Sequence, residues 1–349
     1  MGERLWIHRA KACATFVAAM ALCLGSAAPS HARPASAPAA FMADVRSFLA
    51  TSLQTGRVYQ ISVALPDGYS RRHAPYPVLY ALDANAEFGT VVETARLLAF
   101  GGEIPGVVVV GIGYPKPGQG FRAANVGRTL DLTPTSDPEW IRTSAKDSMP
   151  QPVPVPDRSG GGPRFLRFLE TRLVPLIERR YNVSHDDRAL AGHSFGGLFA
   201  AYALLQGDGA FRRFLIGSPS LWWDHQAMLG MEEAYAASGR ALNARVFLSS
   251  GALEDGTGGH PMTSDFKAFV DRLKARNYRG LEFGTHVFEG EDHGSVLGAT
   301  VSRGLRFIYA PAPAPASTRG LGAAGRRAGG AKTARPGAPS LTGRPRAAP

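Results

Sequence analysis

The sequence predicts an α/β domain in which a mostly parallel sheet is covered by helices on both faces. Two observations support this. Short apolar runs that read as buried strands alternate with longer segments whose apolar residues recur at helical spacing. Within 188–205, a serine flanked by glycines also stands between such a strand and such a helix. With 349 residues, 44% of them hydrophobic and 19% charged, the chain has the size and composition of a globular protein with one large domain or two small ones.

The expected strands begin with an alternating pattern that runs from Val58 to the turn at Pro66-Asp67-Gly68. Continuous apolar runs, which are typical of central parallel strands, follow at 77–82 and 107–112. Further strands are expected at 189–191, 214–217, 245–249 and 282–288. Helices are expected at 88–100, 163–181, 198–205, 224–238, 262–277 and 295–309.

Residues 115–162 interrupt this alternation. They are rich in Pro, Gly, Asp and Ser, show little periodicity, and are much longer than an ordinary connection. We interpret them as a long excursion over the active-site face of one domain that spans 33–310, and not as a domain of their own.

The first 32 residues have the pattern of an export signal. Arg4, Arg9 and Lys11 precede an apolar stretch that is too short for a comfortable membrane span, and small residues suitable for cleavage follow it. We therefore expect a periplasmic or secreted protein without stable membrane insertion after cleavage. Both cysteines, Cys13 and Cys23, lie in this segment, so no disulfide is expected in the mature chain.

Residues 311–349 form a Pro-, Ala-, Gly- and Arg-rich tail that cannot bury enough apolar surface to fold. The tail carries seven Lys or Arg and no acidic residue, and the first 32 residues carry a net charge of +2. The overall net charge of +11 therefore leaves about +2 for the rest of the chain. This charge does not predict a nucleic-acid-binding face.

The glycine-flanked serine belongs to the pentapeptide Gly192-His193-Ser194-Phe195-Gly196, which has the G-x-S-x-G form. Between a strand and a helix this motif predicts a nucleophile elbow, a tight turn that holds the Ser194 hydroxyl clear of the sheet. Side chains at 192 and 196 would collide with the neighbouring strand and helix, and glycine avoids this collision. The pattern predicts that Ser194 is the nucleophile of an enzyme.

A serine nucleophile needs a histidine base, and in this type of fold the acid and then the histidine follow the serine along the chain. His293 stands directly after the last expected strand and before the closing helix, where the base belongs. The acid is expected after the strand at 245–249, where spacing favours Glu254 and leaves Asp255 open. The oxyanion donors are expected to be the backbone N–H of Phe195 and one from 84–86. No metal or other cofactor is expected, because the His and carboxylate residues show no ligand spacing.

Several segments resemble the esterase D-related branch of the α/β hydrolases, which includes the trilactone siderophore esterases. They are PVLYALDANAEF, VVVVGIGYP, RTLDLTP, FLRFLETRLVPLIERRYNV, GHSFGGLFAAYALL, GSPSLWW and GEDHGSV, and they span roughly 50–309. The SPSLWW and DLTP segments are fairly specific to this branch, whereas the elbow is not.

The resemblance implies an α/β-hydrolase fold, the triad Ser194, His293 and Glu254, and an oxyanion loop that includes Ala84 and Asn85. The family more often has glycine where this chain has Ala84. Arg128 is implied to lie near the pocket, where it either meets an anionic or catecholate group or forms an ion pair with Asp131. Trp222 and Trp223 are expected to form an aromatic wall, with one of them packed in the core.

These observations favour an exported serine esterase that acts on a small-molecule ester, such as a siderophore lactone or another acyl ester. Acyl transfer with the same triad, a hydrolase-like binding protein without turnover, and adhesion through the basic tail are the alternatives. The sequence leaves the oligomeric state open.

Overall fold

The computed structural model describes residues 42, 44–115, 120–147 and 158–310. The expected export signal, both cysteines and the basic tail lie outside the described residues. Within the described part of the chain, no helix combines the length and the apolar character needed to cross a membrane.

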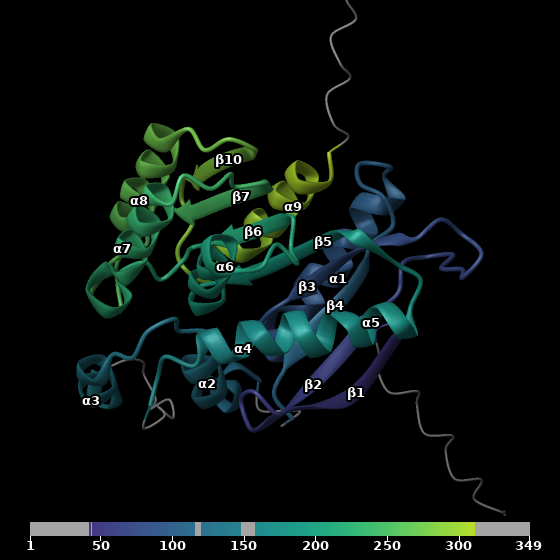
Figure 1. Ribbon diagram of the computed structural model, residues 1–349, viewed down its shortest axis with the longest axis horizontal. Helices are drawn as coiled ribbons and strands as arrows, with labels where there is room; N and C mark the ends of the chain where they lie inside the picture. Colours follow the sequence, from purple (N-terminus) through teal and green to yellow (C-terminus); the bar gives the residue numbers. More distant parts are fainter. Residues whose placement is uncertain (1–41, 43, 116–119, 148–157, 311–349) are drawn as a thin grey trace, which may run out of the picture.

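An eight-stranded sheet with the order β1-β2-β4-β3-β5-β6-β7-β10 organises the chain (Figure 1). Its strands are β1 (Val45–Ser52), β2 (Arg57–Ala64), β3 (Tyr76–Ala81), β4 (Val108–Gly113), β5 (Val183–His193), β6 (Arg213–Gly217), β7 (Ala244–Gly251) and β10 (Leu281–Phe288). From β4 to β10 in this order the strands pair parallel with one another, whereas β2 pairs antiparallel with both β1 and β4 at one edge. The predicted mostly parallel sheet is confirmed.

Helices cover both faces of the sheet, as the sequence predicts. Their bounds are α1 (Ala84–Phe100), α4 (Gly162–Phe168), α5 (Val174–Arg180), α6 (Phe195–Gln206), α7 (Trp223–Ala237), α8 (Met262–Arg276) and α9 (Val296–Tyr309). Consecutive strand residues point to opposite faces. Leu79 and Leu215 therefore pack with α1 and α9, whereas their neighbours Tyr80 and Ile216 pack with the helices of the other face. Figure 1 shows α4 and α5 crossing in front of the sheet.

The 115–162 excursion contains two helices that the sequence analysis did not predict, α2 (Gly120–Asp131) and α3 (Pro138–Asp147). The buried face of α2 is largely polar, since Asn125, Arg128, Thr129 and Asp131 are all buried. Because helix prediction from periodicity depends on apolar residues at the buried positions, a helix with a polar buried face gives no such signal.

The single helix expected at 163–181 is interrupted by a π-helical turn, η1 (Leu169–Leu173), between α4 and α5. Pro175 lies in the first turn of α5 and has no backbone N–H to donate. The N–H of Val174 bonds to the carbonyl of Leu169, five residues back, and one extra residue is accommodated in the turn.

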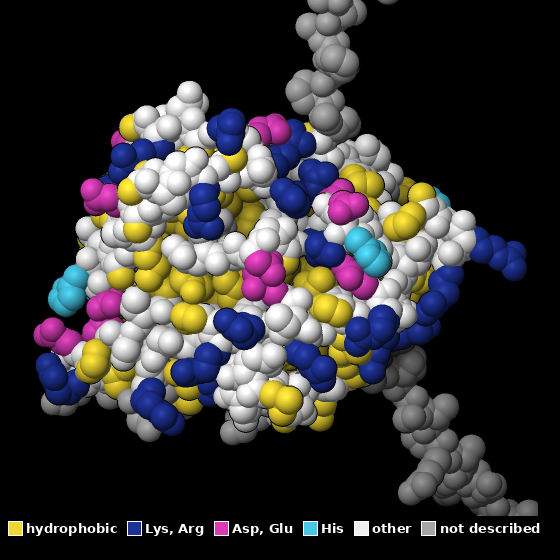
Figure 2. Space-filling model, in the orientation of Figure 1, with side chains coloured by type: hydrophobic (Ala, Val, Ile, Leu, Met, Phe, Trp, Pro, Cys, Tyr) yellow, Lys and Arg dark blue, Asp and Glu magenta, His cyan; other side chains and the backbone are white. Residues whose placement is uncertain are grey.

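Three strands also escaped prediction. The edge strand β1 buries only Ala50 and Ser52, so its sequence shows no clear alternation. The strands β8 (Asp255–Thr257) and β9 (His260–Pro261) form a separate hairpin after β7. On the face shown in Figure 2, Lys and Arg side chains are spread with Asp and Glu between them.

Candidate active site

Ser194 occupies the turn between β5 and α6, at the carboxyl edge of the parallel strands. Its backbone has φ 60° and ψ −121°, a conformation that side-chain-bearing residues rarely adopt and that commonly marks functional sites. The turn is held by a hydrogen bond of 3.1 Å from the Ser194 N–H to the carbonyl of Gly217. A Cβ atom at Gly192 would lie 2.3 Å from the Gly196 backbone, so only glycine fits there. At Gly196 the space is less restricted, since the atom nearest to an added Cβ would be a carboxylate oxygen of Asp83, 3.1 Å away.

Glu254 and His293 meet at the same edge, in the loops that follow β7 and β10. Nδ1 of His293 lies 2.7 Å from Oε2 of the fully buried Glu254 carboxylate. The other carboxylate oxygen accepts hydrogen bonds from the Ser218 hydroxyl at 2.6 Å and the Gly251 N–H at 2.5 Å. In the neutral form of the ring, the carboxylate partner favours the proton on Nδ1, which leaves Nε2 able to accept a proton.

The acidic neighbours of these residues point elsewhere. Asp255, the alternative acid, is exposed and accepts hydrogen bonds from the N–H and hydroxyl of Ser264 in the first turn of α8. Asp292 accepts bonds from the N–H groups of Gly294 and Ser295. Of the candidates that spacing left open, Glu254 is therefore the one whose carboxylate contacts His293.

Opposing effects act on the protonation of Glu254. Burial raises the pKa of a carboxyl group, but here the hydrogen bonds from His293, Ser218 and Gly251 outweigh it and lower the pKa of Glu254 below its ordinary value. The carboxylate therefore stays charged and is available to stabilise a protonated His293.

The loops that carry Glu254 and His293 are joined to each other and to the elbow. Leu253 donates its N–H to the carbonyl of Glu291 at 3.0 Å. Nε2 of His193, the residue before Ser194, lies 2.8 Å from the carbonyl of His293 and donates to it. Burial lowers the pKa of His193 to about 3, with a further contribution from the nearby His293, so the His193 ring is neutral. This hydrogen bond ties the end of β5, and with it the turn at Ser194, to the backbone of His293.

Ser194 and His293 both line a cavity of about 340 Å³. Its other lining residues among those described are Trp140, Thr143, Phe195, Ser220, Trp222, Thr257, Gly258, His260 and Met262. No hydrogen bond joins the Ser194 hydroxyl to His293 within the described residues, and such catalytic bonds often shorten only when substrate is bound. Trp140 and His260 are wall residues that were not predicted from the sequence. Trp140 lies on the unpredicted helix α3, and His260 stacks on Trp222 with ring centroids 3.5 Å apart.

The expected oxyanion donors lie at two helix N-termini. Phe195 is the first residue of α6 and lines the cavity. Ala84 and Asn85 are the first residues of α1, whose N-cap Asp83 has φ 51°. The side chain of Asn85 accepts from the Tyr114 N–H at 2.7 Å and donates to the Tyr114 carbonyl at 2.9 Å, which ties α1 to the end of β4. Asn85 thus has a visible structural role in fixing the loop.

The expectations for Arg128 are corrected by the structure. Arg128 is not among the described residues that line the cavity, and its recorded ion pair joins Asp83 and not Asp131. Its guanidinium forms a bidentate ion pair with Asp83 at 2.8 and 2.9 Å, and both side chains are almost fully buried. Asp131 instead accepts bonds from Arg57 and Tyr59. Arg128 also lies 5.1 Å from the Phe195 ring centroid, so it packs beneath the two helix ends named above.

The expected aromatic wall divides as predicted between cavity and core. Trp222 lines the cavity, whereas Trp223 is 1% exposed and donates its indole N–H to the carbonyl of Thr135 at 3.1 Å. Trp223 therefore supports the wall from behind and offers no surface to a ligand.

Comparison with known proteins places this geometry in a family. A family model described as "Putative esterase" matches residues 142–306, which contain Ser194, Glu254 and His293. The chain is 34% identical to the ferri-bacillibactin esterase BesA of Bacillus subtilis, over 75% of this chain and 88% of that protein. The chain belongs to this esterase family. As a member of it, the protein is a carboxylic ester hydrolase.

Other relatives agree with the esterase assignment. A siderophore enterobactin esterase of Emericella nidulans is 31% identical over 72% of this chain and 89% of that protein. Among solved structures, the BES protein from Bacillus cereus superposes with a TM-score of 0.65 at 31% identity, covering 77% of this chain and 97% of that one. An IroE-like serine hydrolase from Shewanella oneidensis superposes with a TM-score of 0.64 at 29% identity, covering 76% of this chain and 80% of that one. The α/β-hydrolase fold of the esterase is thereby confirmed.

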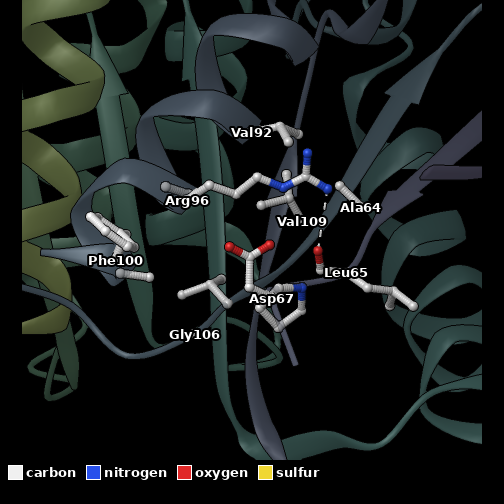
Figure 3. A pocket seen from close by; sticks show the side chains of 12 residues that line it. Ala64, Leu65, Asp67, Val92, Arg96, Phe100, Gly106 and Val109 are labelled. Atoms are coloured by element: carbon white, nitrogen blue, oxygen red, sulfur yellow. Dashed lines mark hydrogen bonds between the residues drawn. The ribbon is translucent and has the colours of Figure 1, made fainter. Parts of the chain in front are cut away.

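The esterase has a second cavity, of about 210 Å³, near the amino end of β4 and the carboxyl end of α1 (Figure 3). Its lining is mostly apolar, with Arg96 lying across it and donating to the carbonyl of Leu65 at 3.3 Å. Asp67 points into the same space. Among the described lining residues there is neither a serine nor a histidine. In the part of the chain that the structure describes, no group of three or more His, Cys, Asp or Glu is placed to hold a metal ion.

Proposed function

We propose that the esterase uses Ser194, His293 and Glu254 as a catalytic triad that acts through an acyl-enzyme. The observation that carries this proposal is the 2.7 Å contact between Glu254 and Nδ1 of His293, at a cavity that His293 shares with Ser194. This contact leaves Nε2 as the only ring nitrogen able to accept a proton. The strained backbone of Ser194 and the lowered pKa of Glu254 support the same roles.

In the proposed reaction, Oγ of Ser194 attacks the ester carbonyl carbon while its proton passes to Nε2 of His293. The tetrahedral intermediate collapses, and the ester oxygen leaves as an alcohol that takes the proton from His293. Water then loses a proton to His293 and attacks the acyl carbon. The acid is released and Ser194 recovers its proton. Glu254 remains charged throughout and stabilises the protonated His293.

The developing oxyanion would be bound by the N–H of Phe195 and by an N–H from the start of α1, either Ala84 or Asn85. The first N–H groups of a helix lack acceptors within it, and the helix dipole favours negative charge at this end. Each such donor is worth on the order of 3 kcal/mol of barrier.

We further propose a siderophore lactone as the substrate and a periplasmic or extracellular location. The substrate proposal is supported by the names of the relatives, which act on ferri-bacillibactin and on enterobactin. The proposed location rests on the signal-like pattern of the first 32 residues.

The test is hydrolysis of p-nitrophenyl acetate and of an enterobactin-type trilactone by the wild type and Ser194→Ala. We expect the variant to lose on the order of 10⁴-fold in kcat. Ser47→Ala is a matched control, because the hydroxyl of Ser47 lies on the exposed face of β1 and bonds Ser62. Equal rates in wild type and Ser194→Ala would overturn the triad. Cleavage of the p-nitrophenyl ester without cleavage of the trilactone would overturn the substrate.

A further inference from the structure

The edge strand β1 turns half of its backbone hydrogen-bonding groups away from the sheet. In an antiparallel pair, alternate residues exchange N–H and C=O bonds with the partner strand, and the residues between them point outward. The N–H of Leu65 donates to the carbonyl of Asp44 at 3.1 Å, in register with the pairing of β1 and β2, so the even-numbered residues of β1 bond to β2. The residues that point outward are Val45, Ser47, Leu49 and Thr51.

This outer edge is open. Figure 1 shows β1 as the outermost strand of the sheet. Ser47, Leu49 and Thr51 are exposed, and no hydrogen bond joins their outward backbone groups to another described residue. β1 contains neither a proline nor a bulge, and its only charged residue is Arg46. An exposed edge of this kind is a template for pairing with another extended chain.

A helical segment lies beside the edge and leaves a groove of about 230 Å³ next to it. The groove is lined by residues 49–51 of β1 and by Phe168, Arg172, Leu173, Leu176 and Arg179 of the helical segment.

Contacts near both ends of the groove hold the strand and the helical segment in place. Nε2 of Gln54 donates to the hydroxyl of Thr171 at 3.1 Å near one end. Near the other end, the guanidinium of Arg180 lies 4.4 Å from the ring centroid of Phe48. The groove is therefore formed before any partner binds.

The helical side of the groove is basic at its two ends and apolar between them. Arg172 and Arg179 are exposed, and neither forms an ion pair with a residue that the structure describes. Leu173 and Leu176 lie between them in the chain and line the same groove. None of the described lining residues is acidic. The groove is thus complementary to a chain whose acidic side chains flank an apolar one.

The charge of the groove also distinguishes between the occupants of the edge. A second copy that paired through its own β1 would place Arg172 and Arg179 of both copies along one shared edge, and like charges across a contact oppose association. The segment 311–349 carries seven Lys or Arg and no acidic residue, so it is repelled as well. An acidic extended segment gains both the backbone hydrogen bonds and the charge pairing.

We propose that β1 and the groove beside it bind an extended acidic segment of a partner protein by strand addition. The segment bonds to the outward groups of Ser47, Leu49 and Thr51 and extends the eight-stranded sheet by one strand. This interaction is separate from ester hydrolysis, because none of the three residues lines the cavity of Ser194 and His293.

The spacing of the arginines defines the sequence that fits. Side chains at every second position of the added strand face the helical segment. The pattern acidic–x–apolar–x–acidic therefore places the apolar side chain on Leu176 and one acid near each arginine. Its two acids are about 13 Å apart. The Cα atoms of Arg172 and Arg179 are about 10 Å apart along the helix axis, and an arginine side chain spans the difference.

The experiment uses the capped peptide acetyl-TDTVTDT-amide with a fluorescent label, titrated with the full chain and followed by anisotropy. We expect saturable binding with a Kd on the order of 10–100 μM. Arg172→Gln with Arg179→Gln should weaken binding by about 3- to 30-fold, because two exposed charge pairs are lost. Arg164→Gln with Arg279→Gln removes the same net charge at exposed residues outside the groove and should leave the Kd unchanged.

Two further measurements test the strand pairing itself. A peptide methylated on the backbone nitrogens of its three central residues keeps its charges but loses N–H donors, so it should not bind measurably. At ten times the Kd, the unmodified peptide should slow hydrogen exchange at the amides of Ser47, Leu49 and Thr51 by about tenfold. Thermal unfolding of the two double variants should match the wild type, since all four arginines are exposed.

Several results would overturn the proposal. One is the absence of saturable binding up to about 1 mM peptide. Another is equal binding of the methylated peptide, or equal weakening by the two double variants, because either would show attraction by charge alone. Binding without protection of the three amides would place the peptide elsewhere. A dimer of the chain that protects these amides without peptide would assign the edge to a second copy.

Discussion

The buried pair between Arg128 and Asp83 provides a quantitative test of how the excursion is fixed to the catalytic face. The substitution Arg128→Met keeps most of the side-chain volume and removes the charge. The Asp83 carboxylate, 1% exposed, is then left buried without its bidentate partner. Breaking a buried pair in this way costs about 3–5 kcal/mol of unfolding free energy. For a domain of this size, that corresponds to a fall in Tm of roughly 6–20 °C.

Urea unfolding of the wild type and Arg128→Met, followed by circular dichroism, measures this loss. The control is Arg306→Met, which breaks the pair with Glu103, where both side chains are about half exposed. Exposed pairs contribute about 0–1 kcal/mol, so the control should unfold near the wild-type midpoint. The double variant Asp83→Asn with Arg128→Met removes both charges, and asparagine tolerates the left-handed backbone of Asp83. It should be more stable than Arg128→Met alone. A loss below about 1 kcal/mol in Arg128→Met, or a double variant less stable than the single one, would refute the reasoning.

Three further predictions concern the proposed triad acid, the turn at Ser194 and a buried carboxyl. Glu254→Gln should lower kcat by about 10³- to 10⁴-fold, because the amide no longer stabilises a protonated base, whereas Asp255→Asn should stay within about threefold. Gly192→Ala should abolish activity and soluble expression, whereas Gly230→Ala, in open space on α7, should stabilise the fold by up to about 1 kcal/mol. Burial, partly offset by Arg57 and Tyr59, raises the pKa of Asp131 from 3.8 to about 6. The folded state therefore binds more protons than the unfolded state between these values, so stability relative to Asp131→Asn should fall by about 3 kcal/mol as pH rises through this window.

Steady-state kinetics with p-nitrophenyl acetate checks the first of these, and comparable losses in both variants would contradict the assignment of the acid. Expression and thermal unfolding check the second, and a folded, active Gly192→Ala would show that the elbow can move. Urea titrations at a series of pH values check the third. If the stability of the wild type relative to Asp131→Asn stays constant or increases as pH rises, the predicted direction of the pH dependence is wrong.

Much of the fold and of the proposed triad could be predicted from the sequence because these features depend on local pattern and chain order. The apolar runs of β3, β4 and β5 are buried on both faces, so they show as continuous hydrophobic stretches. Glycine is required at position 192 because a Cβ atom there would collide with the backbone of Gly196, four residues further along the same turn. His293 could be chosen as the candidate base because it stands in the loop that directly follows the last strand of the sheet.

The remaining features depend on contacts between distant segments that single-sequence patterns do not encode. Arg128 and Asp83 are 45 residues apart, and the pattern around Arg128 does not show which of several acids it meets. The helix α2 is stabilised by polar contacts, so hydrophobic periodicity misses it. His260 acts as a wall residue because a short hairpin stacks it on Trp222.

The hydrogen bonds between the loop of Glu254 and the loop of His293 have a consequence for how the esterase loses activity on heating. Ala252 and Leu253 donate their N–H groups to Phe288 and Glu291, and the Glu254–His293 contact closes the same set. Neither loop can open without breaking bonds to the other, so the two form one cooperative opening unit. Their amide protons should therefore exchange with solvent at a common rate. Thermal inactivation should accordingly occur as a single step, in which Glu254 and His293 become displaced together.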